Sequence, residues 1–213
     1  MEITVKDLGK QFKEEWIFRN LDYRFLSDNI YAIIGPNGSG KSTLIQVLSG
    51  YLPQSHGTVS YLSGEKRISP ENFFLHISVA TPYIELIEEF TTRELLDFHF
   101  KFKALSPAIQ LDEFLEVIEL GGTDDKMIKN FSSGMKQRLK LGLAFYARTP
   151  IILLDEPTTN LDAKGVDWYQ ALLDTHKHKK TIIIASNQPY EYSQSNQQLN
   201  ILDYKSKTTR GIM

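Results

Sequence analysis

The sequence predicts an α/β fold that combines a mostly parallel sheet, an antiparallel β subdomain at the N-terminal end and an inserted helical subdomain. Two continuous apolar runs, 151–154 and 181–184, are typical of parallel strands that are covered on both faces. Residues 3–8 and 16–25 instead alternate aromatic or β-branched residues with charged ones, which favours paired antiparallel strands. From about 90 to 147 the apolar residues recur at helical spacing, which predicts the inserted subdomain.

The remaining elements follow from local signals. Thr91 and Glu94 have the spacing of a capping box and predict a helix start, and Ser106 with Pro107 predicts the start of a second helix. The 213 residues suffice for one substantial core but not for two full-sized domains, so we expect a single domain over residues 1–213. Outside the helical subdomain, the sequence predicts strands at 3–8, 16–25, 30–34, 58–62, 73–80, 151–154 and 181–184, and a helix at 41–50.

The segment 35–43 predicts a phosphate-binding loop. It matches G-x-x-x-x-G-K-[ST] between a predicted strand and a predicted helix, which is typical of a P-loop NTPase core. Its glycines permit a tight turn that points backbone N–H groups at an anion, next to the positive end of the helix. We expect Lys41 to reach the β- and γ-phosphates and the Ser42 hydroxyl to ligate Mg²⁺. The predicted nucleotide contacts in this loop are Gly35, Pro36, Asn37, Gly38, Ser39, Gly40, Lys41, Ser42 and Thr43.

Composition argues against several classes of partner and site. Twenty-four Lys and Arg against 26 Asp and Glu give a formal charge of −2, which does not favour a nucleic-acid partner. The chain has no cysteine, which excludes disulfides and Cys-ligated metals. The N-terminal residues lack the apolar core of a signal peptide, and the apolar runs are far too short to span a membrane. We therefore expect a cytoplasmic protein.

Three further segments follow the phosphate loop in a fixed order. Residues 131–138 read Phe-Ser-Ser-Gly-Met-Lys-Gln-Arg, residues 151–156 are an apolar run that ends in Asp-Glu, and residues 159–162 read Thr-Asn-Leu-Asp. Together with the loop, they resemble the ATP-binding subunit of ATP-binding-cassette (ABC) transporters across essentially the whole chain. Segment 131–138 is similar to the family signature, although a Ser replaces one of its glycines and a Met replaces its Gln.

The carboxylates of Asp155 and Glu156 leave their predicted strand at the carboxyl edge of a parallel sheet, where open α/β proteins bind ligands. We expect Asp155, with Ser42, to hold Mg²⁺. Glu156 is expected to accept a proton from the attacking water. With Lys41, these residues predict hydrolysis of ATP.

The resemblance also implies partners. In the family, two cassettes pack head to tail, and each ATP lies between the phosphate loop of one chain and the signature of the other. Ser132 and Gly134 would then contact the ATP of a second cassette, identical or different, and Asp162 would cross the interface. Phe12 would stack on adenine, with Trp16 as the substitute. A separate transmembrane subunit is implied, which would place this chain at the inner face of the membrane.

Two family landmarks are missing. The family has a Gln after the strand that precedes the helical subdomain, whereas residues 81–89 contain none, and either Tyr83 or Glu85 could substitute for it. The family also has a His that contacts the γ-phosphate, and Asn187 occupies that place. A neutral amide still donates a hydrogen bond but cannot carry positive charge. We expect residues 82–89 to dock the membrane subunit.

The sequence thus favours an ATP-hydrolysing subunit that powers a transporter through ATP-dependent dimer closure, with Glu156, Lys41 and Asn187 as catalytic residues and ATP with Mg²⁺ as cofactors. The alternative is an ATP-dependent binding switch that hydrolyses poorly, which both missing landmarks favour. A phosphotransferase is disfavoured by the signature segment. A GTPase is disfavoured because residues 186–188 lack a guanine-reading motif.

Overall fold

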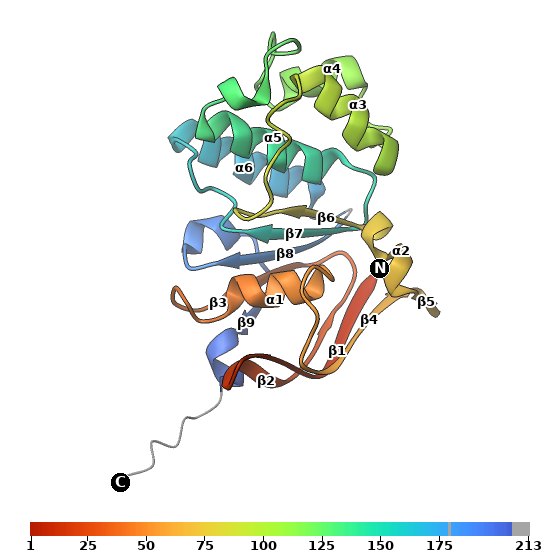
Figure 1. The fold of residues 1–213 in the computed structure, drawn as a ribbon, viewed down its shortest axis with the longest axis vertical. Helices are drawn as coiled ribbons and strands as arrows, with labels where there is room; N and C mark the ends of the chain where they lie inside the picture. The colour runs from red at the N-terminus through yellow and green to blue at the C-terminus, as the bar shows by residue number, and fades with distance from the viewer. Residues whose placement is uncertain (179, 206–213) are drawn as a thin grey trace.

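The computed structural model describes residues 1–178 and 180–205, and it confirms the predicted α/β fold (Figure 1). The strands are β1 Glu2–Phe12, β2 Glu15–Phe25, β3 Ile30–Ile34, β4 His56–Ser63, β5 Lys66–Ile68, β6 Ile77–Ala80, β7 Ile151–Asp155, β8 Thr181–Ser186 and β9 Gln197–Asn200. The helices are α1 Lys41–Leu48, α2 Pro70–Phe73, α3 Thr92–Phe102, α4 Leu111–Val117, α5 Ser133–Tyr146 and α6 Ala163–His176. Short 3-10 turns are η1 Phe74–His76, η2 Ile128–Asn130, η3 Pro189–Tyr192 and η4 Ile201–Tyr204.

The strands form two sheets. One is antiparallel, in the order β2-β1-β4-β5. The other is parallel, in the order β6-β7-β8-β3-β9. Because β7, β8 and β3 are neighbours and run in one direction, the segments that follow them meet at one edge of the parallel sheet. That edge is where the sequence predicts the phosphate loop and the two carboxylates.

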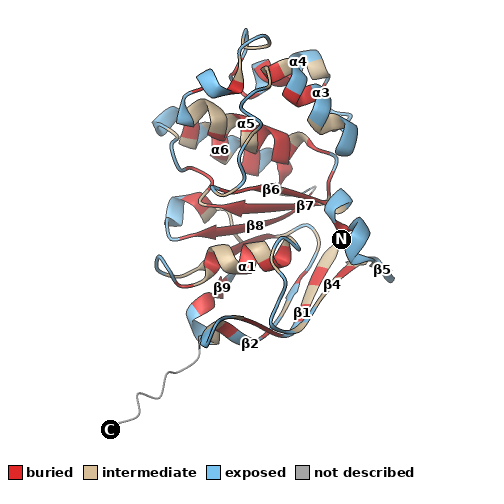
Figure 2. Ribbon diagram, in the orientation of Figure 1, coloured by how far each residue is buried: buried red, intermediate tan, exposed pale blue. Residues whose placement is uncertain are grey.

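Three apolar clusters hold the layers together. One lies between the antiparallel sheet, α1 and one face of the parallel sheet, and a second lies between the opposite face and helices α5 and α6. The third joins α3, α4 and α5 in the helical subdomain. Figure 2 shows that β7 and β8 are buried along their whole length, which agrees with their continuous apolar sequences.

Capping residues fix the starts of two helices. Thr91 and Glu94 form the predicted capping box at the start of α3. At the start of α5, the Ser132 hydroxyl accepts a hydrogen bond from the backbone N–H of Met135 at 3.2 Å. The beginning of α5 is therefore set by the same residue that the sequence assigns to the signature.

The structure corrects three predictions of secondary structure. Ser106 and Pro107 do not open a helix, because Leu105 pairs with Ala147 and the Ser106 N–H donates to the Tyr146 carbonyl at 2.7 Å. The second helix begins at Leu111 instead. Only the second half of 73–80 is a strand, since α2 and η1 occupy the residues before Ile77. The edge strands β5 and β9 were not predicted from the sequence.

Candidate functional site

The phosphate loop connects β3 to α1, and three of its glycines have positive φ. Gly35 has φ 151° and Gly40 has φ 107°, a region that residues with a side chain rarely adopt. Space is also limited, because a Cβ on Gly40 would lie 2.5 Å from Cγ2 of Ile17 on β2. Both the backbone geometry and the neighbouring strand therefore require glycine at this position.

Lys41 is the first residue of α1 and is only 4% exposed. Its ammonium group donates to the carbonyl oxygens of Gly35 at 2.9 Å and Pro36 at 3.1 Å. The lysine thus closes the loop onto itself. No side chain of the described residues caps the start of α1, so its N–H groups are available to an anion.

Asp155 ends β7 and is 2% exposed. Burial raises the pKa of its carboxyl group to about 6, although a hydrogen bond from Ser42 works in the opposite direction. Its Oδ1 atom is buried and makes no hydrogen bond within the described residues. A buried carboxylate oxygen beside a hydroxyl suits Mg²⁺, which usually takes one or two protein ligands and completes its shell with phosphate and water. The residues present therefore fit the predicted ion.

Glu156 and Asn187 face the phosphate loop from the ends of β7 and β8. Glu156 has φ 45°, and its N–H donates to the Ala185 carbonyl at 2.9 Å. Its side chain borders two hollows of about 200 Å³ each, one over the loop and one beside Asn187. The Asn187 side-chain amide donates to Oδ1 of Asn37 in the loop at 2.8 Å. The structure thus brings Lys41, Asp155, Glu156 and Asn187 to one edge of the sheet.

Glu191 is a residue that the sequence reading missed. It lies in η3, is 1% exposed, and accepts a hydrogen bond from the Thr158 N–H at 2.8 Å. The hydroxyl groups of Thr158 and Ser186 donate to the same carboxylate. A single Glu on a short turn gives no local signal, because its partner Thr158 lies 33 residues earlier in the chain.

A family model described as "ABC transporter" matches residues 18–159. The chain belongs to the ABC transporter family. It is 31% identical to an uncharacterized ABC transporter ATP-binding protein, YybJ, of Bacillus subtilis, over 87% of this chain and 85% of that one. It is 29% identical to the cytochrome c biogenesis ATP-binding export protein CcmA of Haemophilus influenzae, over 97% and 98% of the two chains. The chain thus has ATP-binding subunits of ABC transporters as its relatives.

Solved structures of ABC cassettes share the fold. The dimeric structure of MJ0796, a bacterial ABC transporter cassette, aligns with a TM-score of 0.79 at 22% identity, covering 93% of this chain and 94% of that one. A further ATP-binding subunit of an ABC transporter aligns with a TM-score of 0.82 at 24% identity, over 94% and 87% of the chains. Within the described part of the chain, no helix has the length and apolar character that crossing a bilayer requires.

The predicted signature residues lie apart from the phosphate loop. Ser132 is exposed at the start of α5, and neither it nor Gly134 borders the hollow over the loop of the same chain. Asp162 caps α6 by accepting from the Gly165 N–H at 2.8 Å, and its carboxylate lies 3.9 Å from the Arg138 guanidinium group. Ser132 and Asp162 therefore lie at exposed helix starts, where each caps its own helix.

The residues predicted to stack on adenine lie on the β1–β2 hairpin. Phe12 is 46% exposed, and the Lys10 ammonium group lies 4.8 Å from the centre of its ring. Trp16 packs against Gly9 on the neighbouring strand. Of the residues on this hairpin, it is Ile17 that borders the hollow over the phosphate loop.

In segment 81–89, which lacks the family Gln, the two candidate substitutes Tyr83 and Glu85 lie in different surroundings. Burial raises the pKa of the Tyr83 hydroxyl, and the charge of Asp155 adds to this shift. Glu85 instead lines a groove against the helical subdomain, where its charge acts on Lys140 of α5. Of the two candidates, Tyr83 is therefore the one whose pKa is affected by the charge of Asp155.

Proposed function

We propose that this chain is the ATP-hydrolysing subunit of an ABC transporter and that two such chains close around ATP. The observation that carries the proposal is the convergence of the phosphate loop, Asp155, Glu156 and Asn187 at one sheet edge. A loop of backbone N–H groups and a lysine binds phosphates, and a free carboxylate beside it can take a proton from water.

Each residue has one task in this proposal. Phosphate oxygens would replace the two carbonyl groups that now hold the Lys41 ammonium group, and Ser42 with Asp155 would hold Mg²⁺. The ion supplies charge neutralisation at the β- and γ-phosphates. Glu156 would orient the attacking water, and the Asn187 amide would turn from Asn37 to a γ-phosphate oxygen.

The second half of the site would come from a partner chain. Ser132 is exposed, its hydroxyl is already oriented by the start of α5, and the first N–H groups of this 14-residue helix can receive an anion. In the described part of the chain, this helix start does not border the hollow over the phosphate loop. A head-to-tail dimer would bring the ATP of the partner to this helix, and MJ0796, a cassette of the same fold, has a dimeric structure.

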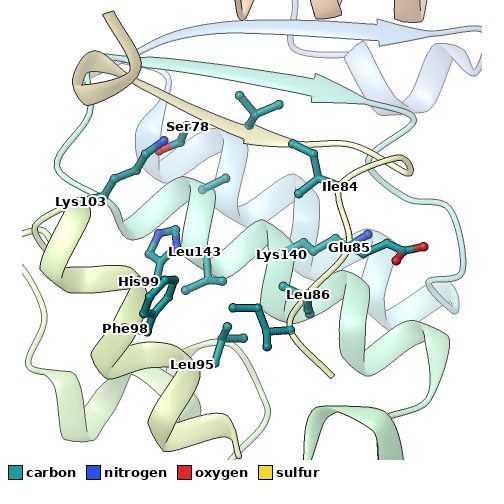
Figure 3. Close-up of a pocket in the computed structure, with 13 residues that line it drawn as sticks. Ser78, Ile84, Glu85, Leu86, Leu95, Phe98, His99, Lys103, Lys140 and Leu143 are labelled. Carbon is teal, nitrogen blue, oxygen red and sulfur yellow. The ribbon is translucent and has the colours of Figure 1, made fainter. Parts of the chain in front are cut away.

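We further propose that a groove of about 310 Å³ between the parallel sheet and the helical subdomain receives the membrane subunit. Figure 3 shows Ile84 and Leu86 on one side of it and Leu95 and Phe98 on the other, with Glu85 at one end. Ile84 is 36% exposed and Phe98 is 43% exposed, so the groove presents apolar side chains at the surface. This agrees with the sequence-based docking segment 82–89.

A second function, an ATP-dependent switch that closes but turns over slowly, is favoured by two observations. Asn187 supplies a neutral donor, and residues 81–89 contain no Gln. Removing a donor of the type that stabilises developing charge lowers rates by about 10²-fold. The switch and the transporter motor share the same ATP site and differ in turnover.

The test is phosphate release by the purified chain at several protein concentrations, with Mg²⁺ and with a chelator. A motor that needs two chains per site predicts Mg²⁺-dependent release with a specific activity that rises with protein concentration. ATP-driven dimerisation without release would favour the switch. A specific activity that does not change with protein concentration would contradict an ATP site shared by two chains.

A further inference from the structure

The carboxylate of Glu191 joins two segments that approach the ATP site from different strands. Thr158 follows Glu156 by two residues and precedes Asp162 by four, and Ser186 directly precedes Asn187. One oxygen, Oε1, accepts from the Thr158 N–H and hydroxyl, whereas Oε2 accepts from the Ser186 hydroxyl. The two oxygens of one side chain therefore hold the two segments at a fixed separation.

The surroundings of Glu191 make this link rigid. No ion pair of Glu191 is found in the described ranges, so the three donors from Thr158 and Ser186 are what compensate its buried charge. Hydrogen bonds to an ionised carboxylate are roughly twice as strong as those between neutral groups. The backbone is fixed as well, because the Tyr169 hydroxyl donates to the Glu191 carbonyl at 2.9 Å.

The Glu191 carboxylate provides a direct path by which a motion of one segment can reach the other. Because protein interiors are close-packed, a shift of Asn187 toward a phosphate displaces Ser186, and the shared carboxylate passes that displacement to Thr158. The hollow of about 200 Å³ beside Glu191 is bordered by Asn37, Glu156 and Asn187, so the linked segments face the reacting groups.

We propose that Glu191 is a positioning residue that couples Asn187 to segment 158–162, so that contact with the γ-phosphate on one side sets the placement of Glu156 and Asp162 on the other. The proposal rests on the proposed function, because it assigns Glu191 a part in that reaction. A merely structural Glu191 would affect folding stability alone.

A double-mutant cycle between Glu191 and Asn187 separates these roles. Single-turnover hydrolysis, ATP affinity and melting temperature are measured for Glu191→Ala, Asn187→Ala and the double variant. We expect each single change to slow hydrolysis about tenfold while ATP affinity changes less than about twofold. The double variant should be within about threefold of either single variant, because both changes break the same link.

Two further variants serve as controls. Glu191→Gln keeps the shape and one acceptor oxygen, so it should restore part of the rate lost in Glu191→Ala. Thr149→Val removes a different buried hydrogen bond, the 2.8 Å contact with Ser78 near the other ends of the strands. It should lower the melting temperature and leave the hydrolysis rate unchanged.

The outcomes are distinct. Independent effects that multiply to about a hundredfold in the double variant would overturn the coupling. So would a Glu191→Ala chain that is less stable but hydrolyses ATP at the wild-type rate. A wild-type chain that binds no ATP would instead overturn the proposed function, and the coupling with it.

Discussion

The two halves of the proposed ATP site differ in how completely one chain builds them. At the phosphate loop, Lys41 and Asp155 are almost fully buried and their neighbours hold them in place. At the start of α5, Ser132 is exposed and does not border the hollow over the phosphate loop. A ligand site needs groups on several sides. In our proposal the first half therefore binds a nucleotide by itself, whereas the second is complete only against another molecule.

The two halves also differ in how closely their residues match the family motifs. In the first half, the conformations of Gly35 and Gly40 exclude other residues. In the second half, Ser133 and Met135 replace common signature residues, and neither is needed to cap α5, since the Ser132 hydroxyl does so. The cap of α5 therefore does not depend on the side chains of the two residues that depart from the signature.

We expect the largest effect from a substitution at the phosphate loop, the half of the proposed ATP site that one chain builds by itself. Lys41→Ala should weaken ATP binding about a hundredfold or more, because the buried ammonium group is the cation closest to the loop carbonyls. ATP affinity by calorimetry, together with the melting temperature, is the measurement. Lys66→Ala on exposed β5 is the matched control. Wild-type affinity in Lys41→Ala would remove the loop from the ATP site.

A substitution at the start of α5, the half that needs a second chain, should affect dimerisation instead of ATP binding. Ser132→Arg should abolish ATP-dependent dimerisation while changing the ATP affinity of the monomer by less than about twofold, because the added side chain occupies the space of the partner's phosphate. Light scattering with and without ATP reports the dimer. Ser63→Arg, at an exposed end of β4, is the control. A Ser132→Arg chain that still dimerises would exclude this helix from the interface.

Asn187 lies in the half of the site at the phosphate loop, but it stands where the family has a His. Asn187→Ala should slow single turnover by about tenfold, which corresponds to about 1.4 kcal/mol. Asn187→His should raise the rate several-fold with little change in affinity, because an imidazole stabilises developing charge better than an amide. An Ala variant as fast as the wild type would make Asn187 a bystander and point to Ser186.

The smallest effect is expected at the groove between the parallel sheet and the helical subdomain. Ile84→Glu should reduce the fraction of the chain that sediments with membranes of its native cells, because it places a charge among apolar side chains. Leu75→Glu, at an apolar position that is 45% exposed and lies outside the groove, should leave that fraction unchanged. Equal sedimentation of the two variants would move the docking site elsewhere.

Sequence reasoning succeeded where function is encoded locally. The loop 35–43 and the strands 151–154 and 181–184 carry their signals in consecutive residues, and the structure has the predicted elements there. It failed where contacts between residues far apart in the sequence determine the local structure. Ser106 is held by the end of α5 instead of starting a helix, and Glu191 is recognised only through its contacts with Thr158 and Ser186. Such contacts arise from the fold and leave no pattern in the local sequence.

The shared site is tested most directly by Glu156→Gln. The amide keeps the shape of the side chain but cannot accept a proton from water, so bound ATP should persist. Light scattering after addition of ATP and Mg²⁺ should show a stable dimer with two bound ATP molecules, and a monomer without nucleotide. A Glu156→Gln chain that binds ATP and remains monomeric at all protein concentrations would contradict the head-to-tail site.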